Sequence, residues 1–210
     1  MATISIPSCK QCRREGKKLF LKGERCLTTK CAIVKRNYPP GQHGQASTRK
    51  KLTGYGTQLR EKQRAKRTYG VLERQFRLYY EKAKRTTGQT GETMLVSLER
   101  RLDNVVYRSG LATSRSQARQ LVSHGQFTLN GKPVNIPSLQ VKSGDVIAVK
   151  SQRVDSNFWK TVITASAQYD IPTWLTVDRS GLRVTVAQLP NSESIETDLQ
   201  MNLIVELYSL

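Results

Sequence analysis

The 210-residue sequence predicts an α+β fold in which helices pack on a small, five-stranded antiparallel sheet. Two observations support this fold class. Apolar residues recur with helical spacing over residues 71–85, 95–106 and 114–125. After residue 126, short runs alternate apolar and polar residues, and turn sequences separate these runs.

The composition is strongly basic, and the charge is unevenly distributed. Lys and Arg number 35 against 16 acidic residues, a net charge of +19. Residues 1–90 hold 23 Lys and Arg against five Glu, whereas residues 91–210 hold 12 against 11 acidic residues. The basic half indicates a polyanionic partner. Neither a signal-peptide core nor a run of roughly 18 apolar residues occurs, so we expect a cytoplasmic protein that does not bind membranes.

The only cysteines, Cys9, Cys12, Cys26 and Cys31, follow the pattern C-x2-C-x13-C-x4-C. Two close pairs joined by a short loop are typical of a closed tetrahedral site for one structural zinc ion. A disulfide is the weaker interpretation because nothing indicates secretion, and unrelated free cysteines are the other alternative. Residues 1–45 hold few apolar side chains, so metal binding would supply much of the free energy that orders this arm.

The arm continues into a basic segment that we expect to be helical after residue 57. Residues 35–57 are punctuated by Pro and Gly, which predicts an extended loop. Residues 58–67 favour a helix with cations on all sides, which repels itself unless a polyanion neutralises it. Residues 71–85 predict a helix that buries Leu72, Phe76, Tyr79 and Ala83. The candidate RNA contacts here are Arg13, Arg14, Lys17, Lys18, Lys22, Arg25, Lys35, Arg36, Tyr38, His43, Arg49, Lys50, Lys51, Arg60, Lys62, Arg64, Lys66 and Arg67.

Residues 99–150 predict two short helices, a hairpin and a strand. The first helix carries an apolar stripe from Leu95 to Val106, ends at Gly110, and places Asp103 on its flank as a surface ion-pair partner. The second begins at Ser114, a capping residue, and ends at Gly125. Asn130-Gly131 is typical of a two-residue hairpin turn. The candidate RNA contacts of this part are Arg115, Arg119, His124 and Lys132, with solvated side chains as the alternative.

The last third of the sequence predicts further strands of the sheet and one helix. Residues 146–149 favour a strand, residues 155–168 a helix with Phe158 or Trp159 facing the core, and residues 174–186 a second hairpin. The apolar run at residues 202–208 fits either a buried strand or a short helix.

Three stretches resemble one family. Residues 101–138, RLDNVVYRSGLATSRSQARQLVSHGQFTLNGKPVNIPS, resemble the RNA-binding module of the bacterial-type family of small-subunit ribosomal protein number four. CRREG at 12–16 and YPPGQHG at 38–44 resemble the N-terminal part of the same family, so the resemblance covers nearly the whole chain. Some members of this family keep a four-cysteine zinc site.

The resemblance implies a non-catalytic constituent of the small ribosomal subunit, in the cytoplasm or in the matrix or stroma of an organelle. Its implied partners are the 5′ domain of the rRNA, mRNA near its entry path into the ribosome, and neighbouring ribosomal proteins. By binding the rRNA it would nucleate assembly of the small subunit. It implies no small-molecule substrate. It also implies three parts: the arm at 1–45, a helical domain at 46–92 completed by a C-terminal helix within 191–210, and an α+β domain at 93–190 that contains the module at about 99–160.

Two other classes of function remain as alternatives. An RNA-modifying enzyme can carry such a module, but His43 and His124 have no nucleophile at a recognisable spacing, and no phosphate-binding glycine loop occurs. A zinc-dependent DNA-binding regulator would need a recognition helix after the cysteines, where the sequence predicts a loop.

Overall fold

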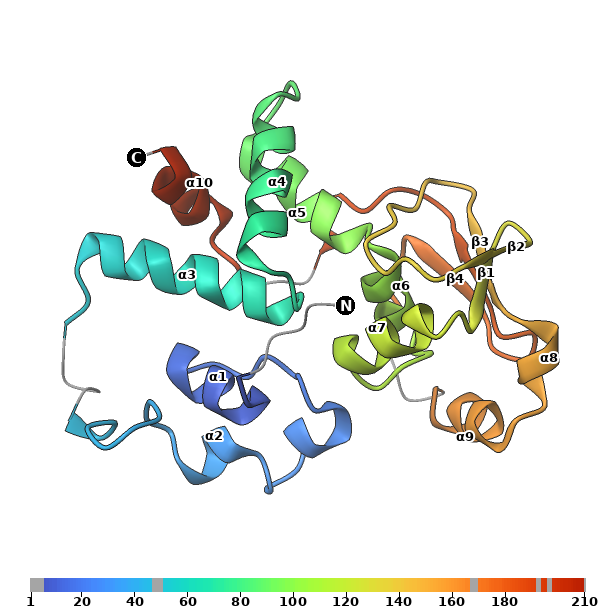
Figure 1. Ribbon diagram of the computed structural model, residues 1–210, viewed down its shortest axis with the longest axis horizontal. Coiled ribbons are helices and arrows are strands. Elements are labelled where there is room, and N and C mark those ends of the chain that lie inside the picture. Colours follow the sequence, from blue (N-terminus) through green and yellow to red (C-terminus); the bar gives the residue numbers. More distant parts are fainter. Residues whose placement is uncertain (1–5, 47–50, 167–169, 192–193, 196–197, 210) are drawn as a thin grey trace. The chain divides into compact units, whose positions relative to one another are not determined.

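The computed structural model describes residues 6–46, 51–166, 170–191, 194–195 and 198–209. Contacts divide the chain into two units (Figure 1). Residues 1–94 and 197–210 form the first, which we call the helical unit, and residues 95–196 form the second, the sheet unit. Arg49 and Lys50, two of the candidate RNA contacts, lie outside the described residues.

The helical unit is built from short helices joined by turns. Its elements are α1 (Ser8–Glu15), a 3₁₀ turn (Gly23–Cys26), α2 (Ala32–Lys35), α3 (Gly54–Thr68), α4 (Glu73–Lys84), the start of α5 (Thr90–Glu99) and α10 (Met201–Ser209). The buried face of α4 presents Phe76, Tyr79, Tyr80 and Ala83, as the periodicity predicts except that Leu72 is exposed.

The C-terminal segment completes this unit as a helix, the form that the resemblance implies and the local pattern leaves open. Helix α10 packs along α3 (Figure 1). Its Tyr208 ring stacks on Tyr80 of α4 with 4.9 Å between the centroids, and Ile204 is fully buried. The local pattern of this segment allows either a strand or a helix. The neighbouring helices that bury its apolar side chains therefore determine that it is a helix.

The sheet unit confirms the predicted five-stranded antiparallel sheet. Its strands are β1 (Phe127–Leu129), β2 (Lys132–Val134), β3 (Val146–Val149), β4 (Leu175–Asp178) and β5 (Arg183–Val186), in the order β2-β1-β3-β5-β4. Asn130 and Gly131 have φ values of 50° and 79°, as the type I′ turn between β1 and β2 requires.

Helices cover the sheet and close the core of this unit. They are α6 (Leu102–Arg108), α7 (Arg115–Ser123), α8 (Ser151–Val154) and α9 (Asn157–Ser166). The core joins Val105 of α6 and Val122 of α7 to Phe127 of β1 and Trp159 of α9. Trp159 rather than Phe158 faces the core, since Phe158 is exposed.

The prediction of a single helix over residues 95–106 is wrong, because this stretch forms parts of two helices, α5 and α6. The chain leaves the helical conformation at Arg101, where ψ is 136°. Its backbone there pairs with a loop of the sheet unit, because the Leu102 amide donates to the Leu139 carbonyl and the Val141 amide to the Arg100 carbonyl. These long-range hydrogen bonds replace the helical ones that the apolar periodicity favours.

Candidate functional site

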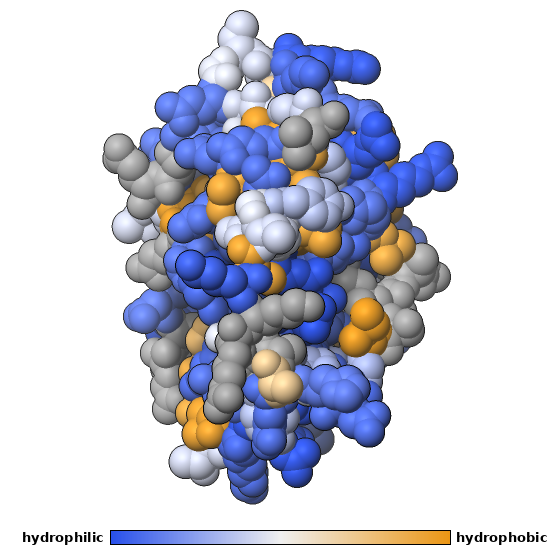
Figure 2. All heavy atoms as spheres, turned by 90° about the vertical axis from the view of Figure 1, so that its left-hand side faces the viewer, coloured by the Kyte–Doolittle hydropathy of each residue, from blue (hydrophilic) through white to orange (hydrophobic). Residues whose placement is uncertain are grey.

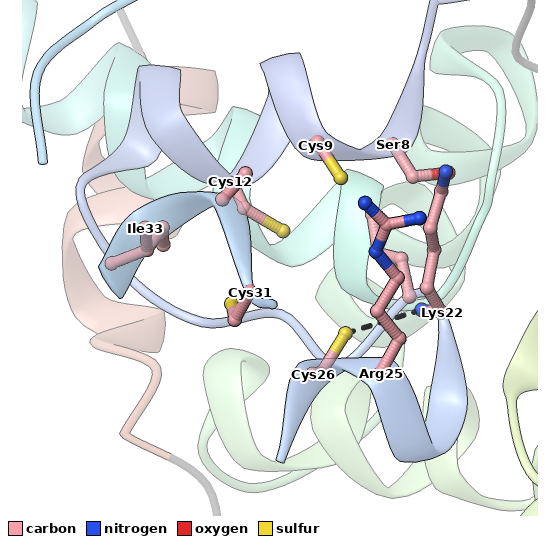
Figure 3. A pocket seen from close by; sticks show the side chains of 10 residues that line it. Ser8, Cys9, Cys12, Lys22, Arg25, Cys26, Cys31 and Ile33 are labelled. Atoms are coloured by element: carbon pink, nitrogen blue, oxygen red, sulfur yellow. Dashed lines mark hydrogen bonds between the residues drawn. The ribbon is translucent and has the colours of Figure 1, made fainter. Parts of the chain in front are cut away.

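The four cysteines line one pocket in the helical unit. Helix α1 places Cys9 and Cys12 about one turn apart, Cys26 closes the 3₁₀ turn, and Cys31 precedes the first residue of α2. Figure 3 shows the sulfur atoms of Cys9, Cys12 and Cys26 pointing into the space between these elements. The pocket has room of about 20 Å³, enough for one water-sized sphere.

The sulfur atoms are partly buried, and hydrogen-bond donors lie near them. Burial raises the pKa of the Cys12 thiol, the backbone of Leu19 opposes that shift, and the three other cysteines add to the rise. The amide of Lys22 donates a hydrogen bond to Sγ of Cys26 at 3.4 Å. Such donors stabilise thiolates, the form of cysteine that binds metals.

The pocket supplies soft sulfur donors suited to zinc, but it is not in a ligating geometry. All four cysteines are free of disulfide bonds in this structure. Within the described ranges, no three His, Cys, Asp or Glu side chains lie close enough together to form a metal-binding group. A chain that places four thiols around one small pocket, without disulfides, nonetheless matches the donor set of a structural zinc site.

The cations of α3 are paired with carboxylates of the same unit, which corrects the expectation that a polyanion must neutralise this helix. Both Arg60 and Arg67 contact Glu15 of α1, whose side chain is 1% exposed. Nζ atoms of Lys62 and Lys66 lie 2.7 and 3.0 Å from the carboxylate of Glu73 in α4. These pairs join α3 to both neighbouring helices.

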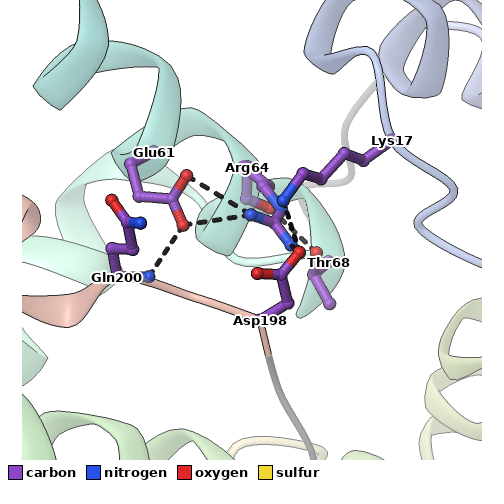
Figure 4. Close-up of polar contacts among 6 residues, drawn as sticks. All are labelled: Lys17, Glu61, Arg64, Thr68, Asp198 and Gln200. Carbon is purple, nitrogen blue, oxygen red and sulfur yellow. Dashed lines mark hydrogen bonds and ion pairs between the residues drawn. The ribbon is translucent and has the colours of Figure 1, made fainter.

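The fifth cation of α3 reaches the chain segment before α10. The guanidinium of Arg64 lies 2.9 Å from Asp198 and also contacts Glu61, and Lys17 of the arm pairs with the same Asp198 (Figure 4). The backbone amide of Gln200 donates a hydrogen bond to the carboxylate of Glu61 at 2.9 Å. Residues far apart in the sequence thus meet at one end of α3, and the candidate RNA contacts Lys17 and Arg64 act within the protein there.

The Glu73 carboxylate is strongly perturbed by its partners in this network. Partial burial by itself would raise the pKa of Glu73, but hydrogen bonds from Lys62, Lys66 and Tyr208 outweigh that effect and lower this pKa to about 2. Burial raises the pKa of Glu15, and the charges of Arg60 and Arg67 oppose this shift. Both carboxylates therefore serve the packing of the unit.

Arg13 holds the loop that follows the cysteines. Its guanidinium donates to the backbone carbonyl oxygens of Tyr38 and Pro39 at 2.9 and 3.3 Å, and it lies 4.7 Å from the centroid of the Tyr38 ring. This side chain positions the loop. Other candidate contacts of the arm and loop are exposed: Arg14, Lys18, Lys22, Arg25, Lys35, Arg36, His43 and Lys51.

In the sheet unit, α7 begins as the sequence predicts. The hydroxyl of Ser114 accepts a hydrogen bond from the amide of Gln117 at 3.3 Å, and the Gln117 side chain bonds Thr113. Gly125, with a φ of 63°, follows the C-terminal His124, which is exposed. Arg115 and Arg119 lie on α7, whereas Lys132 is exposed on β2 of the hairpin.

A polar network under α7, which the sequence does not predict, orients Arg115. The carboxylate of Glu99 is buried and accepts two hydrogen bonds from Arg108, both at 3.1 Å, and one from the amide of Asn104 at 2.7 Å. The side-chain oxygen of Asn104 accepts from Nε of Arg115 at 2.8 Å. The Arg115 guanidinium also lies 4.4 Å from the centroid of the Tyr107 ring.

Asp103 belongs to the interior, which corrects its expected place at the surface. Its carboxylate accepts two hydrogen bonds from buried Arg101, at 3.0 and 2.6 Å, and lies 3.9 Å from Arg119. Glu99 and Asp103 each directly follow a buried leucine, Leu98 and Leu102, and this adjacency was the available sign of such a network. Their charge favours solvent, however, and only the packed partners reverse that preference.

One face of the molecule is mainly hydrophilic. Figure 2 shows a face covered mainly by hydrophilic side chains, with apolar side chains in scattered groups. In the described part of the chain, no helix is both long and apolar enough to cross a membrane.

Comparison with known proteins agrees with this architecture. Residues 4–99 match the Ribosomal protein S4/S9 N-terminal domain family, and residues 100–147 match the S4 domain. Small ribosomal subunit protein uS4 of Clostridioides difficile (strain 630) is 57% identical, and those of Citrifermentans bemidjiense and Heliobacterium modesticaldum are 56% and 55% identical. Each comparison covers 100% of both chains. The chain belongs to the family of small ribosomal subunit protein uS4.

Proposed function

We propose that this protein is a non-catalytic structural constituent of the small ribosomal subunit and binds its rRNA. The observation that carries the proposal is the 57% identity to a small ribosomal subunit protein uS4 over the full length of both chains. The basic composition and the S4 domain at residues 100–147 support it. The 5′ domain of the rRNA, early assembly, mRNA nearby and contacts with neighbouring ribosomal proteins remain parts of this proposal.

The binding chemistry follows from Arg115 and Arg119. They lie one turn apart on α7, and Arg115 is held by Asn104 and Tyr107. Because a preoriented guanidinium loses less conformational entropy on binding, this arrangement favours contact with RNA phosphates. Each phosphate contact releases a condensed counterion, which makes the affinity depend on salt.

We also propose that Cys9, Cys12, Cys26 and Cys31 hold one structural zinc ion. All four line the same pocket, and the Lys22 amide already donates to Sγ of Cys26. Zinc would supply a closed crosslink between α1, the 3₁₀ turn and α2, and it would have no catalytic part. Three of the four thiols are buried, which suits a structural site.

The RNA proposal is tested by titrating the protein with a 5′-domain rRNA fragment across a salt series, with duplex DNA and bulk RNA as competitors. We expect a preference for the rRNA fragment. Replacing Arg115 and Arg119 by Gln should lower the salt slope by about 2. The control replaces exposed Arg153 and Lys160 by Gln, which removes the same charge. Equal binding to every RNA, or a preference for duplex DNA, would contradict the proposal.

A further inference from the structure

The outer face of α4 carries cations that the protein itself leaves exposed. Arg74, Arg77, Lys84 and Arg85 are all exposed and follow one another at spacings of three, seven and one. At 1.5 Å per residue they form a stripe roughly 16 Å long on the side opposite the buried Phe76 and Ala83. We call these four residues the α4 stripe.

The α4 stripe differs from α3 in how its charge is balanced. Every cation of α3 between Arg60 and Arg67 contacts a carboxylate of the helical unit. On the α4 stripe, only Arg77 has a carboxylate partner among the described residues, Glu81 at 3.2 Å. That pair is exposed on both sides, and such pairs one turn apart on a helix are weak.

This difference decides which helix gains more from a polyanion. A phosphate that contacts an α3 cation must compete with a protein carboxylate already in place, so little counterion release results. A phosphate that contacts Arg74, Lys84 or Arg85 displaces no carboxylate of the described residues, and at Arg77 it competes only with the weak, exposed Glu81 pair. The free energy of phosphate binding therefore favours α4.

Helix stability accounts for only part of the α4 stripe. The helix macrodipole favours cations in the last turn, which explains Lys84 and Arg85, but it disfavours them in the first turn. Arg74 is the second residue of α4. Arg74 therefore opposes the helix dipole and has no carboxylate partner among the described residues. This indicates that Arg74 serves a function other than stabilising α4.

We propose that the α4 stripe is an rRNA contact surface, in addition to α7, and that it binds the phosphate backbone. The proposal rests on the proposed function. An acidic protein is the less suitable partner, because protein interfaces have an apolar or aromatic centre depleted of charge. Here Leu78 is the one exposed apolar side chain within the stripe, and charged side chains lie beside it: Arg74 one turn before and Glu81 one turn after.

The experiment measures the salt dependence of binding to the 5′-domain rRNA fragment for three full-length variants. The first replaces Arg74 and Arg85 by Gln, and we expect its salt slope to fall by about 2. The second replaces both by Lys, which keeps the charge and should keep the slope. The third is the control with Gln at positions 153 and 160, which should match the wild type. Circular dichroism verifies that α4 remains folded.

The outcomes separate the two proposals. A lower slope in the Gln variant alone supports the α4 stripe. An unchanged slope in that variant, while the wild type binds the rRNA fragment selectively, overturns this inference and leaves the proposed function intact. An equal fall in the control also overturns it, because the effect would then be general charge. A wild type without selectivity would instead contradict the proposed function. Weaker binding of the Gln variant to polyglutamate, with unchanged rRNA binding, would assign the stripe to an acidic protein.

Discussion

The side chain of Asn104 holds Arg115 through a hydrogen bond of 2.8 Å from Nε of the arginine to the amide oxygen. The same amide group donates to Glu99 twice, to its carboxylate at 2.7 Å and its backbone oxygen at 3.0 Å. These two donations fix which way the Asn104 amide points. Arg115 therefore receives its orientation from a residue on another helix.

Replacing Asn104 by Ala should weaken rRNA binding although Asn104 itself touches no RNA in our proposal. It leaves buried Glu99 with one partner fewer, so we expect unfolding to require about 1–3 kcal/mol less. In a double-mutant cycle with Arg115→Ala, the losses of rRNA affinity should not add, because both changes remove the same oriented guanidinium. Additive losses in the folded variants would show that Asn104 does not position Arg115.

The Glu73 network should make the helical unit sensitive to acid. The folded pKa of Glu73, about 2, lies below its ordinary value of 4.5. Its contribution is therefore complete above about pH 5 and is lost as the pH falls toward 2. A shift of this size corresponds to about 3 kcal/mol in a buried group, but the side chain is 44% exposed, so screening lowers the effect to about 1–2 kcal/mol.

Urea unfolding of Glu73→Gln between pH 2 and 7 tests this expectation. The variant should lose about 1–2 kcal/mol at pH 7 and show a flatter acid limb. Glu81→Gln is the matched control, since Glu81 lies on the same helix in an exposed pair with Arg77. Parallel acid limbs for the wild type and Glu73→Gln would contradict the assigned role.

Glu15 should tie the arm to α3. Its side chain is 1% exposed and contacts both Arg60 and Arg67. Glu15→Gln leaves these arginines without their anion, and we expect a loss of about 2 kcal/mol because both retain some solvent contact. Hydrogen exchange should also speed up in α1. Exposed Glu24 in the same arm provides the control Glu24→Gln, and an equal loss there would indicate a general charge effect.

Cys26→Ser should remove zinc and loosen the arm while the sheet unit stays folded. We expect one zinc ion per wild-type chain and none in the variant, because three thiolates no longer close the tetrahedron. Elemental analysis after gel filtration measures the metal, and hydrogen exchange follows residues 6–46. Ser8→Ala alters the same pocket without removing a thiol and should retain zinc. Stoichiometric zinc in Cys26→Ser, or a metal-free wild type, would refute the site.

Local patterns in the sequence determined much of this protein. The Asn130-Gly131 turn, the Ser114 cap and the alternation in β5 depend on neighbours within a few residues, so they follow from backbone preferences and periodicity. The four cysteines come together for a similar reason, because short loops limit the distance between the pairs.

Only the tertiary structure decided which charges face inward. Arg60 meets Glu15 across 45 positions and Arg64 meets Asp198 across 134, so no local pattern could assign these partners. The break at Arg101 has the same cause, since its neighbours pair with residues 139 and 141. A charged side chain prefers solvent until an opposite charge is packed beside it, and packing brings together residues whose separation in the sequence carries no information about their contact.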